Sequence, residues 1–483
     1  MDRRDFLKAV SIGAAALALP RTLRSGKSNA KRPNILFIFA DDQTFEGVHA
    51  LGNDEVQTPN LDRLVRNGVT FTHAYNQGSW TGAVCIASRT MLNTGLFLWN
   101  AHKVDNGTDT RFSQGRKLWS QLIGGAGYDT FMTGKWHVKL DAKAVFDFTT
   151  NIRGGMPKQT EEGYDRPIEG QPDRWKPWDE KLGGYWEGGK HWSEVLGDDA
   201  VGYIEQASKS EKPFFMYLAF NAPHDPRQSP KEYVDKYPLE KVRVPENFLA
   251  EYPYKDAIGC GKTLRDEKLA PFPRTRYAVK VNRQEYYAII THTDAQVGRI
   301  LDALEKSGKA DNTYIFFCAD QGLAVGHHGL MGKQNLFDHS VRVPLMVAGP
   351  AIPKNKKIDT PVYLQDIMPS TLELTGVERP DYVQFKSLMP LIEGKTRKSY
   401  DAIYGGYLAV QRMVTQDGYK LLLYPKIKKV ILFNLNKDPM EMADLADERK
   451  YQKRINVLFA KLLELQRQTG DELDLKSIYP ELL

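Results

Sequence analysis

Cysteine is scarce in this sequence, since the 483 residues hold just three, Cys85, Cys260 and Cys318. An odd number at wide spacing excludes a disulfide framework. Cys318 lies in the apolar run TYIFFCAD, as expected of a small buried hydrophobe, and the surroundings of Cys260 indicate nothing specific. Cys85 is different: in SWTGAVCIASRTM it stands among small and apolar residues, shortly before a serine, an arginine and a threonine. Its setting indicates a role for the side chain.

The chain also lacks a strong charge of one sign. Its 66 basic and 60 acidic residues leave a formal net charge of +6, far from the dense basic patch of a nucleic-acid-binding protein. After the N-terminus, no segment has the roughly 18 consecutive apolar residues that are needed to span a membrane. The content of 41% hydrophobic and 26% charged residues is ordinary for a folded protein. We expect a folded enzyme or binding protein with no nucleic-acid partner and no membrane span.

The N-terminus reads MDRRDFLKAVSIGAAALALP, with paired arginines before a short apolar run that ends in small residues. This pattern is typical of a twin-arginine export signal. A buried N-terminal helix is the alternative, but charges stand only upstream of the run and a basic, polar linker follows it. We predict that residues 1–30 are a signal peptide and linker, and that the twin-arginine export machinery delivers a periplasmic or secreted protein.

Four apolar runs predict buried strands, namely PNILFIFADD, YDTFMTGKWH, KPFFMYLAFNAPH and TYIFFCADQG. Helical segments separate them, which indicates an α/β fold with a large, mainly parallel sheet flanked by helices. Ligands of such sheets bind beyond the carboxyl ends of the strands. We expect the polar residues at these ends to converge there, with ordinary polar strand caps as the alternative. The residues are Asp41, Asp42, Lys135, His137, His224, Asp320 and Gln321.

The pattern changes after about residue 395, where short strands and turn signals such as QDG predict an antiparallel sheet. The closing segment RKYQKRINVLFAKLLELQRQ predicts a terminal helix packed on that sheet, because its apolar residues recur at helical spacing. We therefore predict a large domain over residues 31–395 and a smaller C-terminal α+β subdomain over 396–483.

Two further segments give local predictions. In TPNLDRLVRNG, Thr58 as N-cap, Pro59 at the first position and Gly68 after the last turn predict a short helix. Residues 151–195 predict a long irregular insert that is rich in glycine, proline and tryptophan. Its tryptophans have two equally open roles, which are stacking on sugar rings and packing the loop onto its own domain; they are Trp175, Trp178, Trp186 and Trp192.

The residues at the strand ends suit a metal-dependent reaction. Asp41, Asp42 and Asp320, with the amide oxygen of Gln321, form an oxygen-rich set that suits a hard cation such as Ca²⁺ or Mg²⁺. Without a cation, clustered carboxylates repel one another by roughly several kcal/mol. Cations and proton donors accompany them, and this combination predicts a site for a small tetrahedral oxyanion ester, with a histidine protonating the departing oxygen. These residues are Arg89, Lys135, Lys333, His137 and His224.

The residues from Cys85 to Arg89 match the pattern Cys or Ser, any residue, Pro or Ala, any residue, Arg. Further motifs cover nearly the whole chain: PNILFIFADDQ, TPNLDRLVRNGVTF, GKWH, NAPHDP, ADQG, GLMGKQNLFDHSVRVPLMV and LFNLNKDPMEMADLA. Together they resemble the type I sulfatases of the alkaline phosphatase superfamily, which implies an alkaline phosphatase-like fold and a sulfuric ester hydrolase.

The resemblance implies that Cys85 is not used as a thiol. A maturation enzyme, either formylglycine-generating or anaerobic sulfatase-maturating, oxidises such a cysteine to formylglycine, whose hydrated aldehyde attacks sulfur. The implied metal ligands are Asp41, Asp42, the modified Cys85, Asp320 and Gln321. Arg89 is expected to orient the nucleophile, Lys135 and Lys333 to bind sulfate, His137 to contact the nucleophile and His224 to assist the leaving oxygen. His327 and His328 match no core ligand.

Two departures from the commonest family pattern stand out. Ala87 replaces the more usual proline, which bears on recognition by the maturation enzyme more than on catalysis. Gln321 stands where Asn or His is usual, and its longer side chain favours Ca²⁺ with its flexible geometry over Mg²⁺. If Gln321 swings away, a water or a substrate contact is expected to replace it.

The export signal, the modest positive charge and the tryptophan-rich insert favour a sulfated carbohydrate as the substrate, such as a glycosaminoglycan, an algal polysaccharide or their oligosaccharides. Two other functions are open. Phosphonate monoester hydrolases and phosphodiesterases of the same superfamily also use formylglycine, so a phosphorus ester is the nearest alternative. A glycan-binding protein that keeps the fold without catalysis is the second, although it has no need for a nucleophile or an acid.

Overall fold

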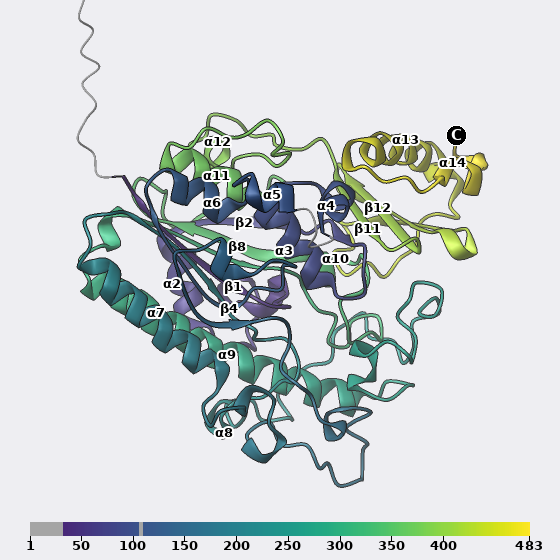
Figure 1. Cartoon of the computed structure of the whole chain (residues 1–483). Coiled ribbons are helices and arrows are strands. Elements are labelled where there is room, and N and C mark those ends of the chain that lie inside the picture. Colours follow the sequence, from purple (N-terminus) through teal and green to yellow (C-terminus); the bar gives the residue numbers. More distant parts are fainter. Residues whose placement is uncertain (1–31, 106–109) are drawn as a thin grey trace, which may run out of the picture. The chain divides into compact units, whose positions relative to one another are not determined.

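The four predicted strands lie side by side in one parallel block, in the order β7, β1, β6, β4 (Figure 1). Their register is continuous, so that Phe37 lies opposite Tyr217 on one side and Phe316 on the other. Because the strands are parallel, their carboxyl ends share one edge of the sheet. This confirms the predicted parallel α/β sheet. The bounds are β1 Asn34–Ala40, β4 Asp129–Lys135, β6 Phe214–Ala219 and β7 Thr313–Ala319.

The structure is a computed structural model that describes residues 32–105 and 110–483. The chain from Pro33 to Leu483 packs as one compact unit. Within the described residues, no helix is long and apolar enough to cross a membrane. The predicted signal peptide lies outside the described residues.

Further strands extend the sheet on both sides, to nine strands within the described part of the chain. β5 (Phe148–Arg153) pairs with β4 at one end. At the other end β8 (Arg342–Ala348) runs antiparallel to both β7 and β2 (Gly68–Tyr75), which makes the sheet mixed. The short strands β9 (Lys356–Ile358) and β10 (Val362–Tyr363) pair with β2.

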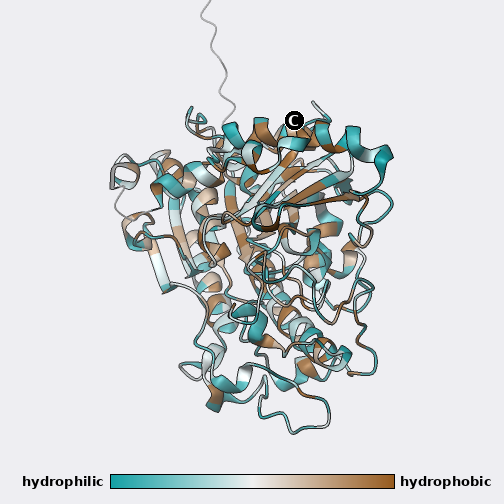
Figure 2. Ribbon diagram, turned by 90° about the vertical axis from the view of Figure 1, so that its right-hand side faces the viewer, coloured by the Kyte–Doolittle hydropathy of each residue, from teal (hydrophilic) through white to brown (hydrophobic). Residues whose placement is uncertain are grey.

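Helices cover both faces of the sheet, which explains why its central strands are apolar throughout (Figure 1). On one face lie α2 (Pro59–Asn67), α7 (Trp192–Ser208) and the long α9 (Arg276–Lys306), and on the other lie α3 (Val84–Thr94), α6 (Trp119–Gly125) and α11 (Ile367–Thr375). Figure 2 shows apolar residues along the strands inside and hydrophilic residues on the outer surfaces. The shorter helices are α4 Leu98–Val104, α5 Thr110–Gln114, α8 Lys231–Val234, α10 Asp338–Val341 and α12 Met389–Ile392.

A second, smaller sheet contains the predicted antiparallel strands, in the order β14, β13, β12, β11. The terminal helix α13 (Gln452–Thr469) packs on it through buried residues such as Leu458 and Phe459. β3 (Gly78–Ser79), which comes from the first part of the chain, pairs in parallel with β11. The remaining bounds are β11 Ile403–Tyr407, β12 Gln411–Gln416, β13 Tyr419–Tyr424, β14 Lys429–Asn434 and α14 Leu475–Ile478.

One local prediction differs from the structure. The predicted helix is present as α2, with Pro59 at its first position and Gly68 directly after its last residue, as predicted. The side chain of Thr58 does not cap it; its hydroxyl accepts a hydrogen bond from the backbone N–H of His49 at 2.9 Å instead. A contact outside the helix therefore replaces the predicted cap.

The segment 151–195 is irregular in its middle, but its first residues belong to β5 and its last residues begin α7. Its tryptophans pack against the protein. Trp175 and Trp186 are buried, the guanidinium of Arg153 lies 3.7 Å from the ring centre of Trp192, and Lys231 faces the ring of Trp178. Of the two roles that the sequence left open, this arrangement favours packing over sugar stacking.

Candidate active site

The predicted site residues come together beyond the carboxyl ends of the parallel strands. Asp41 and Asp42 follow β1, Asp320 and Gln321 follow β7, and Lys135 is the last residue of β4. All five of these side chains are buried, with at most 1% of their surface exposed. His137, two residues after β4, and His224, in the loop after β6, reach the same edge of the sheet. The convergence that the strand ends predicted is therefore present.

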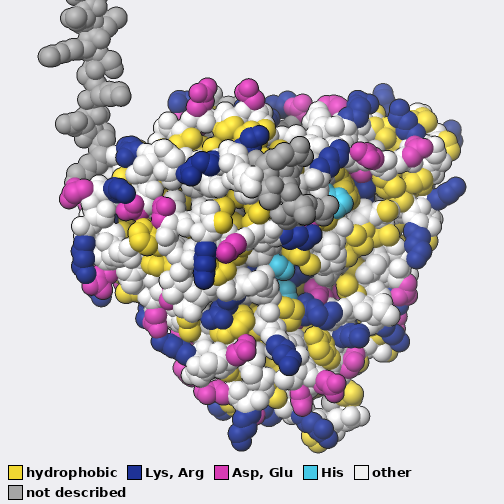
Figure 3. Space-filling model, in the orientation of Figure 1, with side chains coloured by type: hydrophobic (Ala, Val, Ile, Leu, Met, Phe, Trp, Pro, Cys, Tyr) yellow, Lys and Arg dark blue, Asp and Glu magenta, His cyan; other side chains and the backbone are white. Residues whose placement is uncertain are grey.

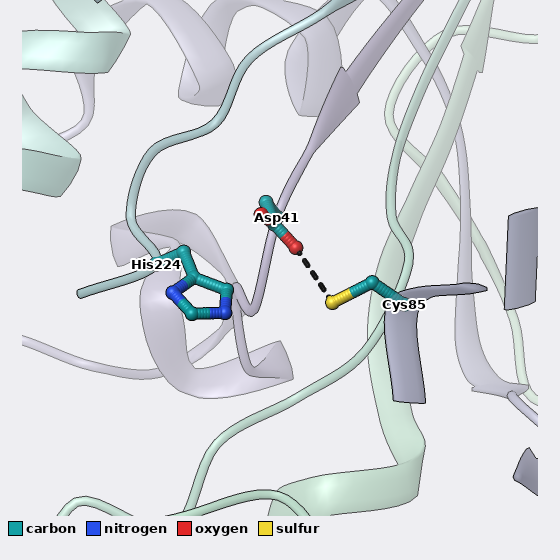
Figure 4. A group of neighbouring side chains, drawn as sticks. All are labelled: Asp41, Cys85 and His224. Atoms are coloured by element: carbon teal, nitrogen blue, oxygen red, sulfur yellow. Dashed lines mark hydrogen bonds between the residues drawn. The ribbon is translucent and has the colours of Figure 1, made fainter. Parts of the chain in front are cut away.

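Cys85 reaches this edge from the first turn of α3. Its Sγ lies 3.1 Å from Oδ1 of Asp41, 3.7 Å from Oδ1 of Asp42 and 3.4 Å from Nζ of Lys333. Figure 4 shows Cys85, Asp41 and His224 directed toward one another from three different segments. The thiol thus occupies the centre of the carboxylate cluster, with a lysine beside it.

Each of the three carboxylates has a buried cation as its partner. Lys135 pairs with Asp41, Nζ of Lys333 lies 2.5 Å from Oδ2 of Asp42, and Nε of Arg89 lies 2.8 Å from Oδ2 of Asp320. Arg89 lies one helical turn after Cys85 on the same face of α3. It also donates to the backbone oxygen of Lys135 at 2.6 Å, and so connects α3 to the end of β4.

The pKa values of two of these groups are raised, and the pKa of a third is lowered. Burial raises the pKa of Asp320 to about 6, and the negative charge of Asp41 adds to the shift. Burial also acts to raise the pKa of Asp41, but the charge of Lys135, followed by those of His224 and Arg89, outweighs it and holds this pKa well below its usual range. For the Cys85 thiol, burial and then the charges of Asp320 and Asp41 raise the pKa well above the usual range.

The two histidines differ in their surroundings. His224 is buried, and its Nε2 lies 3.5 Å from Oδ2 of Asp42. His137 is partly exposed and has a left-handed backbone with φ of 53°. Burial, followed by the charges of Lys135 and Arg89, lowers the pKa of His137 to about 2, so its imidazole is neutral at physiological pH.

A cavity of about 230 Å³ lies beside the cluster and is lined by His137, by Ile86 next to Cys85, and by Lys139. On the face of the molecule that Figure 3 draws, histidine side chains are visible near the middle, with lysine and arginine side chains close to them. The cavity adjoins the predicted site through His137.

The cluster fits a hard divalent cation. One ligand atom from each of Asp41, Asp42, Cys85 and Asp320 can be chosen so that all of them lie within 4.8 Å of one another. Calcium-to-oxygen distances of about 2.3–2.6 Å place opposite ligands about 5 Å apart. The donor set is therefore appropriate for a hard divalent cation.

Gln321 directly follows Asp320 at the end of β7, and its amide has a protein partner. Its Oε1 accepts a hydrogen bond from Nδ2 of Asn76, whose Oδ1 in turn accepts one from Nε2 of Gln365 at 3.0 Å. A carbonyl oxygen has two lone pairs, so the contact with Asn76 leaves one for a cation. Neither Asn76 nor Gln365 belongs to a motif, and their role was missed in the sequence.

Other residues around the site were also missed. Asp225 contacts His224, and Arg265 contacts Asp225. Asp225 directly follows His224 in the motif NAPHDP, which was the available signal, whereas Arg265 stands in a segment without one. His327 and His328 are not in either group of side chains that fits a metal ion within the described chain. His327 pairs with Glu46, and His328 stacks on Phe337 with ring centres 4.0 Å apart.

Comparison with known proteins agrees with this geometry. Residues 33–377 match the family described as Sulfatase, and residues 326–468 match the C-terminal domain described for N-sulphoglucosamine sulphohydrolase. An N-acetylglucosamine-6-O-sulfatase of Bacteroides thetaiotaomicron is 28% identical, over 95% of this chain and 90% of its own. An arylsulfatase of Clostridium perfringens is 29% identical, over 88% and 93%. An ulvan-active sulfatase of Formosa agariphila is 26% identical, over 98% and 90%.

Solved structures share the fold. A protein in complex with its substrate D-glucosamine-2-N,6-O-disulfate superposes with a TM-score of 0.71 and 24% identity, covering 92% of this chain and 100% of the other. The phosphonate monoester hydrolase of Agrobacterium radiobacter gives 0.72 and 21%, covering 91% and 96%. Because the family match spans most of the sequence, the predicted enzyme is confirmed: the chain belongs to the sulfatase family and is a sulfuric ester hydrolase.

Proposed function

We propose that this sulfatase removes sulfate esters from carbohydrate, with formylglycine made from Cys85 as its nucleophilic residue and Ca²⁺ as its metal ion. The observation that carries the proposal is the position of Cys85. Its side chain lies inside a cluster of three carboxylates and three cations, within 3.1–3.7 Å of Asp41, Asp42 and Lys333.

The surroundings of Cys85 do not suit a thiolate nucleophile. Burial and the neighbouring carboxylates raise the pKa of the thiol well above its usual range, so it is protonated at physiological pH. Conversion to formylglycine removes this difficulty. The modified residue supplies a hydrated aldehyde in place of a thiol, and the ion supplies positive charge that balances Asp41, Asp42 and Asp320.

The side chains around Cys85 then have distinct tasks. Arg89 fixes the first turn of α3 through its contacts with Asp320 and with the backbone of Lys135. Lys135 and Lys333 are the cations for the sulfate oxygens, because their ammonium groups are buried beside Asp41, Asp42 and the Cys85 sulfur. His137 lines the cavity and contacts the nucleophile, and His224 gives a proton to the leaving oxygen.

The choice of Ca²⁺ rests on ligand type. Ca²⁺ accepts oxygen ligands in flexible geometry, which suits a set that includes the long side chain of Gln321 better than the strict octahedron of Mg²⁺ does. We assign Gln321 as a further ligand, through the lone pair that its contact with Asn76 leaves free.

Carbohydrate is the proposed substrate because several relatives act on it by name. These include the N-acetylglucosamine-6-O-sulfatase and the ulvan-active sulfatase, which match this chain over nearly its full length. The substrate class is therefore a sulfated polysaccharide or its oligosaccharides. Others, such as a choline-sulfatase of Rhizobium meliloti, act on a different compound by name, so the substrate needs a direct test.

We further propose that the protein is exported by the twin-arginine machinery to the periplasm or the outside of the cell. The support is the N-terminal sequence with Arg3 and Arg4 before its apolar run. This route carries folded proteins, so a formylglycine-generating or anaerobic sulfatase-maturating enzyme can act on Cys85 before export. Replacement of both arginines by lysine is expected to retain the protein in the cytoplasm.

The deciding experiment measures free sulfate by ion chromatography. Enzyme from a maturation-competent host is incubated with sulfated oligosaccharides from glycosaminoglycan, ulvan, carrageenan and fucoidan, with Cys85→Ala as the control. Release of sulfate from one set, lost in Cys85→Ala, is the expected result. Mass spectrometry of the peptide that contains residue 85 reports its conversion, so that failed maturation is recognised.

The same enzyme preparation tests the alternative that the substrate is a phosphorus ester. An aryl sulfate is compared with an aryl phosphate diester and an aryl phosphonate. We expect the sulfate to be turned over fastest. A converted enzyme that prefers the phosphorus esters and releases no sulfate from any sugar contradicts the proposal.

A further inference from the structure

His224 has different partners at its two ring nitrogens. Nδ1 lies 2.9 Å from the backbone oxygen of Asp225 and 3.1 Å from its carboxylate Oδ1. Nε2 faces the other way, 3.5 Å from Oδ2 of Asp42 in the carboxylate cluster. Both partners of Nδ1 are acceptors, so Nδ1 carries a hydrogen and Nε2 is the nitrogen that faces the reacting atoms.

Asp225 is itself held in place. The residue is buried, with 3% of its surface exposed. Its Oδ2 accepts from one guanidinium nitrogen of Arg265, and its Oδ1 lies 3.3 Å from the other. Such a two-point contact fixes the plane of a carboxylate as well as its position. The direction of the His224 ring is thereby determined by a residue outside the metal cluster.

Arg265 also reaches the surroundings of Lys333. It donates to Oδ1 of Asp266, and the Oδ2 of Asp266 accepts from Gln334 at 2.8 Å and lies 4.0 Å from Nζ of Lys333. The guanidinium of Arg265 thus connects Asp225, which lies beside His224, with Asp266, which lies beside Lys333. These acids come from segments about 40 residues apart, so the arrangement depends on the fold and not on a local motif.

We propose that Asp225 and Arg265 are positioning residues for His224: the Arg265–Asp225 pair holds Nε2 of His224 toward the oxygen that leaves from sulfate. The inference rests on the proposed function, because it concerns the residue that assists the leaving oxygen. Without the Asp225 carboxylate, Nδ1 keeps just the backbone oxygen of residue 225 as a partner, and the ring is held less firmly.

A comparison of leaving groups tests this role. A nitrophenolate leaves without a proton, whereas a sugar alkoxide needs one. A misplaced His224 therefore slows the hydrolysis of a sugar sulfate more than that of an aryl sulfate. For Asp225→Ala we expect kcat/KM to fall about 10- to 100-fold with a sugar sulfate and less than about threefold with 4-nitrophenyl sulfate. Arg265→Met is expected to show the same selectivity, and Arg265→Lys a smaller loss, since the lysine retains a cation beside Asp225.

Controls distinguish positioning from a general loss of structure. Asp235→Ala removes an exposed carboxylate that is paired with Lys231, and it is expected to leave kcat/KM unchanged for both substrates. His224→Ala is expected to show the same leaving-group selectivity as Asp225→Ala. The double variant is then expected to be no worse than His224→Ala alone, because two residues that act as one unit are not additive.

The outcomes separate the inference from the function on which it rests. Sulfate release by the unaltered enzyme from both substrates supports the proposed function. With that result in hand, equal losses on both substrates in Asp225→Ala overturn the inference. For a variant that fails to fold, Asp225→Asn and nitrogen-15 spectra of histidine-labelled enzyme provide the readout: we expect a hydrogen-bonded Nδ1–H of His224 in the unaltered protein, beside the Nε2–H that is given to the leaving oxygen, and a weakened or lost Nδ1–H signal in the variant. Unchanged spectra likewise overturn the inference.

Discussion

The backbone of a single residue allows two adjacent carboxylates to serve one site. Successive side chains of a strand point to opposite faces, so Asp41 and Asp42 would separate if β1 continued through them. The strand instead ends at Ala40, and Asp42 has a positive φ of 63°. Both carboxylates therefore reach the thiol of Cys85, each with a lysine of its own. The site depends on this local departure from regular structure.

Gln321 gives a prediction at the same scale. If its amide oxygen contributes to the ion site, Gln321→Ala should weaken calcium binding about tenfold, as is usual when a group that supports a metal site is lost. Gln365→Ala is the matched control, because Gln365 contacts Asn76 and not the ion. Calcium titration by calorimetry measures both. Equal affinity in Gln321→Ala and the unaltered protein means that Gln321 is not a ligand.

The sequence could predict residues that stand at strand ends, because a parallel sheet brings those ends together whatever the details of the fold. Asp41, Lys135 and Asp320 were found in this way. It could not predict Arg265 or Asn76, which lie in connecting segments whose path depends on tertiary packing. Asp225 is intermediate, since it lies in a recognised motif but acts through a contact that the sequence does not display.

At the scale of secondary structure, helix α2 shows how a distant residue replaces a local signal. The sequence predicted Thr58 as its cap, yet the first free N–H groups of α2 are bonded by a residue of α9. Asp294 accepts from the backbone N–H of Leu61 at 2.7 Å and of Asn60 at 3.1 Å. The elements themselves were predictable from apolar spacing, but the partners at their ends were not.

Removal of this distant cap should destabilise the protein. For Asp294→Ala we expect the free energy of unfolding to fall by about 1–3 kcal/mol, because two buried N–H groups lose their acceptor. Asp302→Ala is the control: it also lies on α9 and pairs with α2 through Arg63, at 2.8 Å, but its side chain is 55% exposed. It should change stability by no more than about 0.5 kcal/mol. Urea unfolding compares the two, and equal effects would exclude a capping role.

At the scale of the whole molecule, one hydrophobic cluster joins the two predicted domains. It contains Val84 and Met91 of α3 together with Leu422 of β13 and Phe459 of α13. β3, which precedes Cys85 by a few residues, pairs with β11 of the second sheet. The boundary at residue 395 follows a real change of pattern in the sequence. A linear pattern does not reveal that the core continues across that boundary.

This shared core predicts that the two parts unfold together. Scanning calorimetry of the full chain should show one main transition, and two resolved transitions would contradict a common core.

Lys420 offers a second test of the common core, because it is buried on β13 and pairs with Asp338 at 2.5 Å and with Glu441 at 2.6 Å. Lys420→Met leaves two buried carboxylates without their cation, at a cost of about 3–5 kcal/mol. We expect it to lower the Tm of the single transition, whereas Lys398→Met, at a side chain that is 75% exposed, should leave the Tm unchanged.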